Sequence, residues 1–208
     1  MFWGAIVLLA VAGYLLGNLN GAILISKFIL KEDVRNHGSG NAGLTNFFRS
    51  YGGATTLFVL AIDVLKTVVA ALLGGWMLGR FGYCELGKMI GGAFTVAGHM
   101  FPVFFQFRGG KGILCCAALA GVMDWRALAV ILAVFLLALV LTRYVSLGSC
   151  LGAVCYTPVF AWRFPGNWPI IAIAAVLALA ALFMHRENIK RLLAGTENKF
   201  SFHHNHQG

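Results

Sequence analysis

Long apolar runs alternate with short polar junctions along nearly the whole chain. The apolar runs cover residues 3–26, 54–78, 87–106, 127–142, 150–162 and 170–184, with a shorter run at 113–123. A helix of about 20 apolar residues crosses a bilayer, and lipid requires the backbone to satisfy its own hydrogen bonds. The pattern therefore predicts an all-α fold, a polytopic membrane helix bundle of about seven transmembrane helices. The shorter run is either a short or tilted fourth span or a re-entrant segment.

The basic residues predict how these spans are oriented. Seven spans put the termini on opposite sides of the membrane, and Lys and Arg collect in cytoplasmic loops. One predicted side holds Lys27, Lys31, Arg35, Arg49, Arg108, Lys111, Arg143, Arg186, Lys190, Arg191 and Lys199. The other side holds only Arg80, Lys88, Arg126 and Arg163. We therefore expect an outside N-terminus and a cytoplasmic C-terminus, with one transmembrane domain over residues 1–200 and a disordered tail over 201–208.

Composition narrows the possible partners. The 208 residues are 60 % hydrophobic with a mean hydropathy of +0.82 and a net charge of +9. In a soluble protein this charge would suggest nucleic acid, but here it lies at membrane edges, where anionic lipid heads or phosphorylated substrates fit better. The five cysteines have no metal-ligand spacing, and the tail histidines His203, His204 and His206 lie in the polar terminus. We expect no nucleic acid partner, no metal and no cofactor.

A cationic glycine loop interrupts the apolar pattern most sharply. Gly109, Gly110 and Gly112 lack a Cβ, so the backbone can turn tightly and direct several N–H groups to one place. Arg108 and Lys111 add positive charge there. The loop predicts a phosphate cradle at a membrane surface, although it lacks the spacing of a Walker loop. The alternative is an ordinary basic turn between two membrane helices.

The polar segment between the first two spans has similar chemistry. Gly40 and Gly43 permit close backbone approach, and Arg49 can bind a phosphate with two hydrogen bonds. Short hydrogen-bonding side chains are supplied by Ser39, Asn41, Thr45 and Asn46. The alternative is a helix start capped by Ser39 or Thr45.

Two ionisable residues lie inside the second apolar run. Asp63 and Lys66 are spaced i,i+3, which puts them on one face of a helix. Ions in a membrane segment should pair or face the bundle interior. We favour a buried ion pair that stabilises packing; the alternative is support for the first polar loop.

The segment after the last span begins with two candidate functional residues. His185 and Asn188 share one helical face, and Gly195 is placed to end that helix. His185 can act as a general base or as an interfacial residue. Lys190 and Arg191 are interpreted as lipid-surface anchors.

Four polar stretches share the predicted cytoplasmic side, namely 38–49, 108–112, 143–149 and 185–199. Although they are distant in sequence, they can meet at one pocket. Two phosphate-binding glycine loops against an apolar wall suit a substrate with an acyl tail and a phosphate head. No serine-protease order, nucleophile elbow or HEXXH motif is present in the sequence. The alternatives are a transporter of an organic phosphate and a non-catalytic lipid-binding protein; the chain lacks the half-to-half repeat common in transporters.

Three motifs occur in order along the chain. They are Ser39-Gly40-Asn41-x-Gly43-x-Thr45-Asn46-x-x-Arg49, then Gly98-His99-x-x-Pro102 with Phe107-x-Gly109-Gly110-Lys111-Gly112, and then His185-Arg186-x-Asn188-Ile189-x-Arg191-Leu192-x-x-Gly195-x-Glu197. In these motifs and in size the chain resembles the bacterial acyl-phosphate:glycerol-3-phosphate acyltransferases, the PlsY family. It departs from the family's Asp-x-x-Lys-Gly element, since Thr67 follows Lys66.

The resemblance implies an enzyme of phospholipid biosynthesis in the bacterial plasma (inner) membrane, with seven spans and a cytoplasmic active site. It implies acyl transfer from acyl phosphate to the 1-hydroxyl of glycerol 3-phosphate, which gives lysophosphatidic acid and phosphate. The catalytic residues it implies are Ser39, Arg49, Lys111, His185 and Asn188. The substrate-binding residues are Gly40, Asn41, Gly43, Thr45, Asn46, His99, Gly109, Gly110, Gly112, Ser149, Arg186 and Glu197. The proton is accepted either by His185 or by the substrate's own phosphate.

Overall fold

The computed structural model describes residues 1–200, and every regular element among them is helical. The predicted disordered tail and its three histidines lie outside the described residues. The helices are α1 (Phe2–Gly17), α2 (Gly21–Leu24), η1 (Ile25–Ile29), η2 (Val34–Asn36), α3 (Leu44–Tyr51), α4 (Thr55–Gly79), α5 (Cys84–Met100), η3 (Val103–Phe105), α6 (Ile113–Met123), α7 (Trp125–Thr142), α8 (Val145–Arg163), α9 (Trp168–Met184) and α10 (Arg186–Leu193).

Each predicted span contains a helix, but fewer than seven meet a strict length criterion. Among the described residues, α4, α7 and α8 are long and apolar enough to cross a membrane. The count rises to five if the bent pairs, α1 with α2–η1 and α9 with α10, each form one span. The helix α6 has 11 residues, as expected for a short or re-entrant segment. The seven-span count and the orientation stay predictions.

The first span breaks earlier than its apolar pattern predicts. The helix α1 ends at Gly17, and the chain bends by 41° before continuing from Gly21. The Asn20 side-chain oxygen accepts a hydrogen bond from the Ile23 N–H at 3.0 Å, which caps α2. A polar side chain that replaces a backbone partner can start a new helix within an apolar run.

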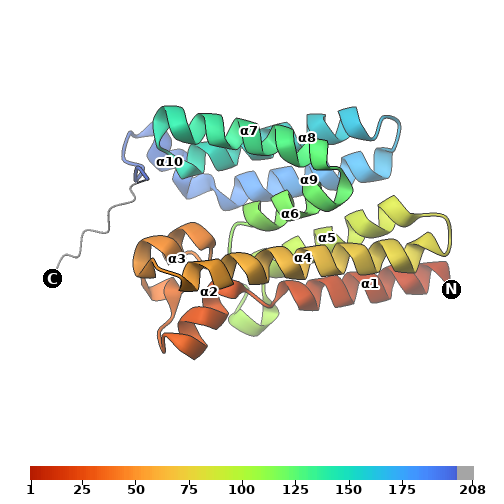
Figure 1. The fold of residues 1–208 in the computed structure, drawn as a ribbon, viewed down its shortest axis with the longest axis horizontal. Coiled ribbons are helices and arrows are strands. Elements are labelled where there is room, and N and C mark those ends of the chain that lie inside the picture. Colours follow the sequence, from red (N-terminus) through yellow and green to blue (C-terminus); the bar gives the residue numbers. More distant parts are fainter. Residues whose placement is uncertain (201–208) are drawn as a thin grey trace.

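The helices pack in two groups joined by α6 (Figure 1). The helices α1, α4 and α5 contact one another, and α8 contacts both α7 and α9. The short α6 packs against α4, α5 and α7, and α5 also contacts α9. The N-terminus and α10 lie at opposite ends of the long axis in Figure 1. The polar segments gather at the end that carries α3 and α10.

Two polar segments are more helical than we expected. The segment between the first two spans contains α3, which begins at Leu44 with Gly43 at the capping position and no side-chain cap. The alternative interpretation of this segment, a helix start capped by Ser39 or Thr45, is therefore wrong. The helix α8 begins at Val145 rather than at residue 150. Ser146 and Ser149 consequently lie one turn apart on a helix face, and not in a loop.

Candidate active site

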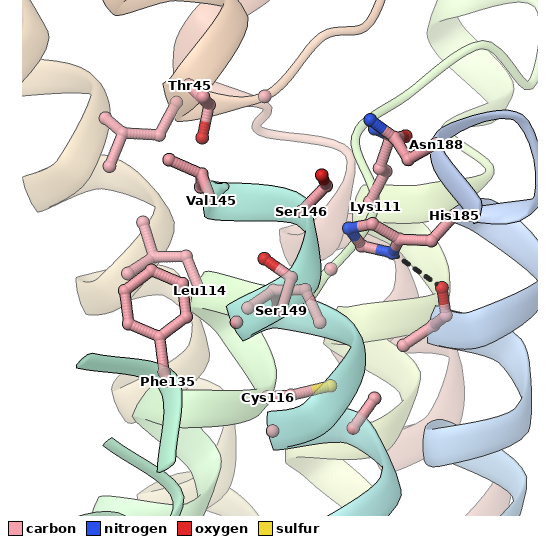
Figure 2. Close-up of a pocket in the computed structure, with 18 of the residues that line it drawn as sticks. Thr45, Lys111, Leu114, Cys116, Phe135, Val145, Ser146, Ser149, His185 and Asn188 are labelled. Atoms are coloured by element: carbon pink, nitrogen blue, oxygen red, sulfur yellow. Dashed lines mark hydrogen bonds between the residues drawn. The ribbon is translucent and has the colours of Figure 1, made fainter. Parts of the chain in front are cut away.

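The four polar stretches converge on one cavity of about 600 Å³ at the end of the bundle that carries α3 and α10. Most of the residues predicted to form a site line it. They are Ser39, Asn41, Gly43, Thr45, Asn46, Arg49, His99, Lys111, Gly112, Ser149, His185, Asn188 and Glu197. Figure 2 shows Lys111, Asn188 and His185 close together at one end of this cavity, with Ser146 and Ser149 of α8 facing them.

Four predicted site residues lie outside the lining. Gly40 is exposed with a left-handed φ of +68°. Gly109 and Gly110 are buried where the glycine loop packs against His99, and a Cβ on Gly110 would collide with the His99 ring. Arg186 is exposed, and its guanidinium donates to the Phe183 carbonyl at 3.1 Å. The cavity therefore gives no support to a substrate-binding role for Arg186.

Asn46 organises the first polar loop from within. Its Oδ1 accepts from the Ser39 N–H at 2.8 Å, while its Nδ2 donates to the carbonyls of His37 at 3.0 Å and Val34 at 3.2 Å. All its polar atoms are thereby used to hold the backbone around Ser39. Asn46 shapes the loop, although the sequence alone suggested direct contact with substrate.

A buried ionic cluster lies behind the cavity. Lys66 Nζ lies 2.7 Å from Asp63 Oδ1 and 2.9 Å from His99 Nδ1, and it also donates to the carbonyls of Gly17 and Leu19. Asp63 Oδ1 accepts from the Gly21 N–H at 3.1 Å. The predicted Asp63–Lys66 pair thus exists and joins both sides of the α1–α2 break to α4.

Hydrogen bonds join the same cluster to both glycine loops, through His99 of α5 and through Asn20, which caps α2. The His99 carbonyl accepts from the Gly110 N–H at 3.1 Å, and Asn20 Nδ2 donates to the Ala42 carbonyl at 3.0 Å. Asp63, His99 and Cys115 also bring three potential metal ligands within 4.8 Å of one another. The Lys66 ammonium, beside two of them, already supplies the positive charge that this position needs.

We expect Asp63→Asn to lower the free energy of unfolding by about 3–5 kcal/mol, because Lys66 would be left buried without its counter-ion. The matched control is Glu85→Gln, which breaks an i,i+3 pair with Lys88 whose carboxylate side chain is 43 % exposed. That change should cost at most about 1 kcal/mol. Unfolding in detergent measures both, and equal losses would show that the buried pair has no special structural role.

A chain of hydrogen bonds links the glycine loop to the C-terminal segment. Lys111 Nζ donates to Asn188 Oδ1, and Asn188 Nδ2 donates to Glu197 Oε1 at 2.8 Å. Glu197 Oε2 accepts from Arg191 Nε at 2.7 Å. Arg191 therefore lines the cavity, and its interpretation as a lipid anchor is wrong. Lys190, whose side chain is 72 % exposed, does lie on the surface.

The cavity mouth is strongly cationic. Arg49, Lys111 and Arg191 face it, and Arg49 also donates to the Asn198 carbonyl at 3.2 Å. Among the described residues, two carboxylates line the cavity. Glu197 lies among these cations, whereas the charge of Asp63 is already neutralised by Lys66. Such an excess of positive charge in a partly desolvated pocket favours a phosphate group.

Burial shifts the ionisation of the groups at this mouth. It lowers the pKa of Lys111 to about 8, against the opposing effect of nearby Glu197. It lowers the pKa of His185, just beyond α9, to about 4. Burial alone would raise the pKa of Glu197, but hydrogen bonds from Asn188 and Arg191 hold it below its usual value. His185 is thus neutral and Glu197 ionised at pH 7.

The His185 ring is held in one tautomer. Its Nδ1 lies 2.8 Å from the Ala181 carbonyl, which can only accept, so Nδ1 carries the proton. The unprotonated Nε2 is then the ring nitrogen turned toward Lys111 in the cavity (Figure 2). A neutral imidazole with a free ring nitrogen can accept a proton.

The inner half of the cavity is apolar and is built from α6, α7, α8 and α9. Its lining residues are Leu114, Cys116, Ala117, Ile131, Leu132, Phe135, Gly152, Ala153, Tyr156, Leu177 and Ala178. Ser146 of α8 lies buried at the boundary between the two halves. The i,i+3 spacing of Ser146 and Ser149 was the available signal, but we counted both residues in the polar stretch 143–149.

Comparison with known proteins agrees with this geometry. The family model described as glycerol-3-phosphate acyltransferase matches residues 7–195. The glycerol-3-phosphate acyltransferase of Thermoanaerobacter pseudethanolicus is 44 % identical over 193 residues, covering 93 % of this chain and 94 % of the relative. That of Shouchella clausii is 39 % identical over 198 residues, covering 92 % of this chain and 94 % of the relative.

Solved structures of an integral membrane protein, PlsY, have the same fold. Its glycerol 3-phosphate form superposes with a TM-score of 0.85 at 32 % identity, covering 94 % of this chain and 96 % of that chain. Its lysophosphatidic acid form gives a TM-score of 0.82, also at 32 % identity, with 94 % and 95 % covered. The resemblance inferred from the three motifs is confirmed: this chain belongs to the glycerol-3-phosphate acyltransferase family.

Proposed function

We propose that this protein transfers a fatty acyl group from acyl phosphate to the 1-hydroxyl of glycerol 3-phosphate, giving lysophosphatidic acid and inorganic phosphate. The observation that supports this most directly is a single cavity with a cationic mouth and an apolar interior. An acyl phosphate has a charged head and a long apolar tail, and glycerol 3-phosphate is a small dianion. The related PlsY has been solved in a glycerol 3-phosphate form and a lysophosphatidic acid form, which supports glycerol 3-phosphate as the acceptor and lysophosphatidic acid as the product.

In this proposal the cationic groups hold the two phosphates. Arg49, Lys111 and Arg191 neutralise phosphate charge, and the backbone around Ser39 binds the head of the acyl phosphate. Glu197, as a carboxylate, would repel phosphate, so we assign it the task of orienting Asn188 and Arg191. Asn188 and Ser149 orient glycerol 3-phosphate.

The chemistry needs no covalent enzyme intermediate, because acyl phosphate is an activated mixed anhydride. The 1-hydroxyl oxygen attacks the acyl carbon, and the bond from that carbon to the phosphate oxygen breaks. Inorganic phosphate leaves with the bonding electron pair, and the hydroxyl proton passes to His185 Nε2 or to the phosphate. Positioning of the hydroxyl and stabilisation of developing negative charge provide the acceleration.

We also propose seven membrane crossings, with the N-terminus outside and the cavity mouth facing the cytoplasm of a bacterial inner membrane. The excess of basic residues in the junctions near α3 and α10 supports this orientation. Water-soluble glycerol 3-phosphate would then enter from the cytoplasm, while the acyl tail enters from the lipid.

Purified protein, acyl phosphate and glycerol 3-phosphate test the proposed reaction when phosphate release and lysophosphatidic acid formation are followed together. We expect both products to require both substrates, and acyl phosphate to outperform an acyl-carrier-protein donor. Phosphate release without glycerol 3-phosphate, or uptake into sealed vesicles without acyl transfer, would contradict the assignment. The second result would favour the transporter hypothesis.

The pKa of Lys111 predicts an alkaline limit to activity. Lysine is charged below its pKa, so its charge is lost as pH rises through about 8 in the free enzyme. We expect kcat/KM to fall above about pH 8, with the apparent KM for the phosphate substrate rising first. Lys111→Arg is the matched variant, because arginine keeps its charge at high pH. This variant should therefore lack the alkaline limb of the pH profile, that is, the fall in kcat/KM. A limb that is identical in both proteins would exclude Lys111 as its cause.

A further inference from the structure

We infer that Tyr156 is the floor of the apolar half of the cavity and sets the longest acyl chain that the enzyme accepts. The inference rests on the proposed acyl transfer and adds a specificity-determining residue to it. The occupant of the apolar half is the acyl tail, because that half is continuous with the cationic mouth that would hold the phosphate head.

The cavity ends at one level on several helices. On α8 its described lining runs from Val145 to Tyr156, and no lining residue lies further along that helix. On the antiparallel neighbour α9 the lining starts at Leu177, and on α7 it starts at Ile131. The ten steps along the helix from Ser146 to Tyr156 correspond to about 15 Å at about 1.5 Å per residue. The apolar half therefore forms a channel that ends at one depth along these helices.

Tyr156 is fixed in place across the end of this channel. Its side chain is only 3 % exposed, and its hydroxyl donates to the Cys116 carbonyl of α6 at 3.0 Å. The ring stacks on Phe160 with their centroids 4.6 Å apart. Tyr156 thus joins α8 to α6, and it cannot turn away without losing a buried hydrogen bond.

Packed core lies directly beyond the ring. Phe160, Val159, Ile170 and Ala174 belong to the same buried cluster as Tyr156, and none of them lines the cavity. The channel walls above the ring are small residues, namely Ala117, Gly152, Ala153 and Ala178. Space for a tail therefore exists above the ring and stops at it.

A tail longer than the channel must overpack this end. Extra methylene groups forced into a packed core cost the equivalent of about 5- to 150-fold in an equilibrium constant. We therefore expect kcat/KM of the wild-type enzyme to fall steeply beyond one chain length. Tyr156→Ala should relax this limit. Relative to the donor that the wild-type enzyme prefers, the kcat/KM of longer donors should rise by about tenfold in this variant.

The experiment measures kcat/KM for a series of saturated acyl phosphates of increasing chain length. Tyr156→Phe retains the ring and should keep the wild-type limit. Gly152→Leu should move the limit to shorter chains, because a Cβ there would meet only Ile131, at 3.5 Å and 3.9 Å, so the added side chain has room to extend into the channel. Val154→Ala, on the exposed face of α8 and outside the cavity, is the matched control and should leave the whole profile unchanged.

The alternative is that the acyl tail leaves the cavity sideways into the bilayer. In that case, Tyr156→Ala would retain activity with an unchanged chain-length profile, which would overturn the inference. If Tyr156→Ala does not fold, Gly152→Leu decides alone, and an unaltered limit in that variant would also overturn it. Loss of all acyl transfer in the wild-type protein is a different outcome, since it contradicts the proposed function itself.

Discussion

Lys111→Ala is expected to lower kcat/KM by about 10²–10³-fold while the bundle stays folded. Lys111 lies at the cavity mouth beside Asn188, where burial already lowers the pKa of its ammonium. A preorganised cation in a site that excludes water stabilises developing phosphate charge far more than it would in bulk solvent. Alanine removes that charge and leaves Asn188 without its donor. Steady-state phosphate release at saturating and limiting glycerol 3-phosphate measures the effect.

The control for this change is Lys190→Ala. Lys190 lies on the next polar stretch, is 72 % exposed and pairs with Glu187 at 3.1 Å. It has the same formal charge as Lys111 but lies outside the cavity, so its loss should change kcat/KM by less than about twofold. Equal losses in the two variants would mean that overall positive charge, and not the position of Lys111, supports the reaction. Wild-type rates in folded Lys111→Ala would remove Lys111 from the site.

His185→Asn is expected to reduce kcat by about 10²–10⁴-fold if Nε2 accepts the proton of the 1-hydroxyl. The ring is neutral at pH 7, and its tautomer is held by the Ala181 carbonyl, so the free nitrogen is available without reorganisation. Asparagine has no comparable base. Single-turnover rates across a pH series should show that the residual activity has lost its dependence on a group with a pKa of about 4.

Arg186→Ala provides the matched comparison. The residue is adjacent in sequence but exposed, and its guanidinium lies over the Phe183 ring outside the cavity. We expect it to retain most of the wild-type rate. If His185→Asn also retains the wild-type rate and pH profile, the substrate phosphate is the proton acceptor and His185 only shapes the pocket.

Local sequence chemistry predicted most of the candidate site. Lys111 in its glycine loop, Arg49 after the first polar loop, and the His185–Asn188 pair each stand out because a charged or polar group beside a long apolar run is costly and therefore informative. The same logic predicted the buried Asp63–Lys66 pair, which the structure confirms. Apolar run length likewise determined the helical class, because lipid leaves the backbone few alternatives to a helix.

The boundaries of the helices depended on partners that the sequence does not reveal. The break after Gly17 is stabilised by Lys66 and Asp63 from α4, which lie more than 40 residues away along the chain. Ser146 and Ser149 belong to α8 because their small polar side chains face a cavity rather than lipid. The hydropathy of one segment does not reveal which distant residues or cavities that segment contacts, so neither helix boundary could be predicted from it.

The apolar runs and the three motifs were enough to predict the class of fold, the family and the charged groups of the candidate site. Three other features became visible only in the tertiary structure. Arg191 is held at the cavity by its hydrogen bond to Glu197, and Asn46 supports the backbone of a loop. Tyr156, bonded to the Cys116 carbonyl, lies at the end of the apolar channel. Composition and periodicity report the solvent that each residue prefers. The direction in which a side chain points, and the residue that it meets, follow from how helices distant in sequence pack against one another.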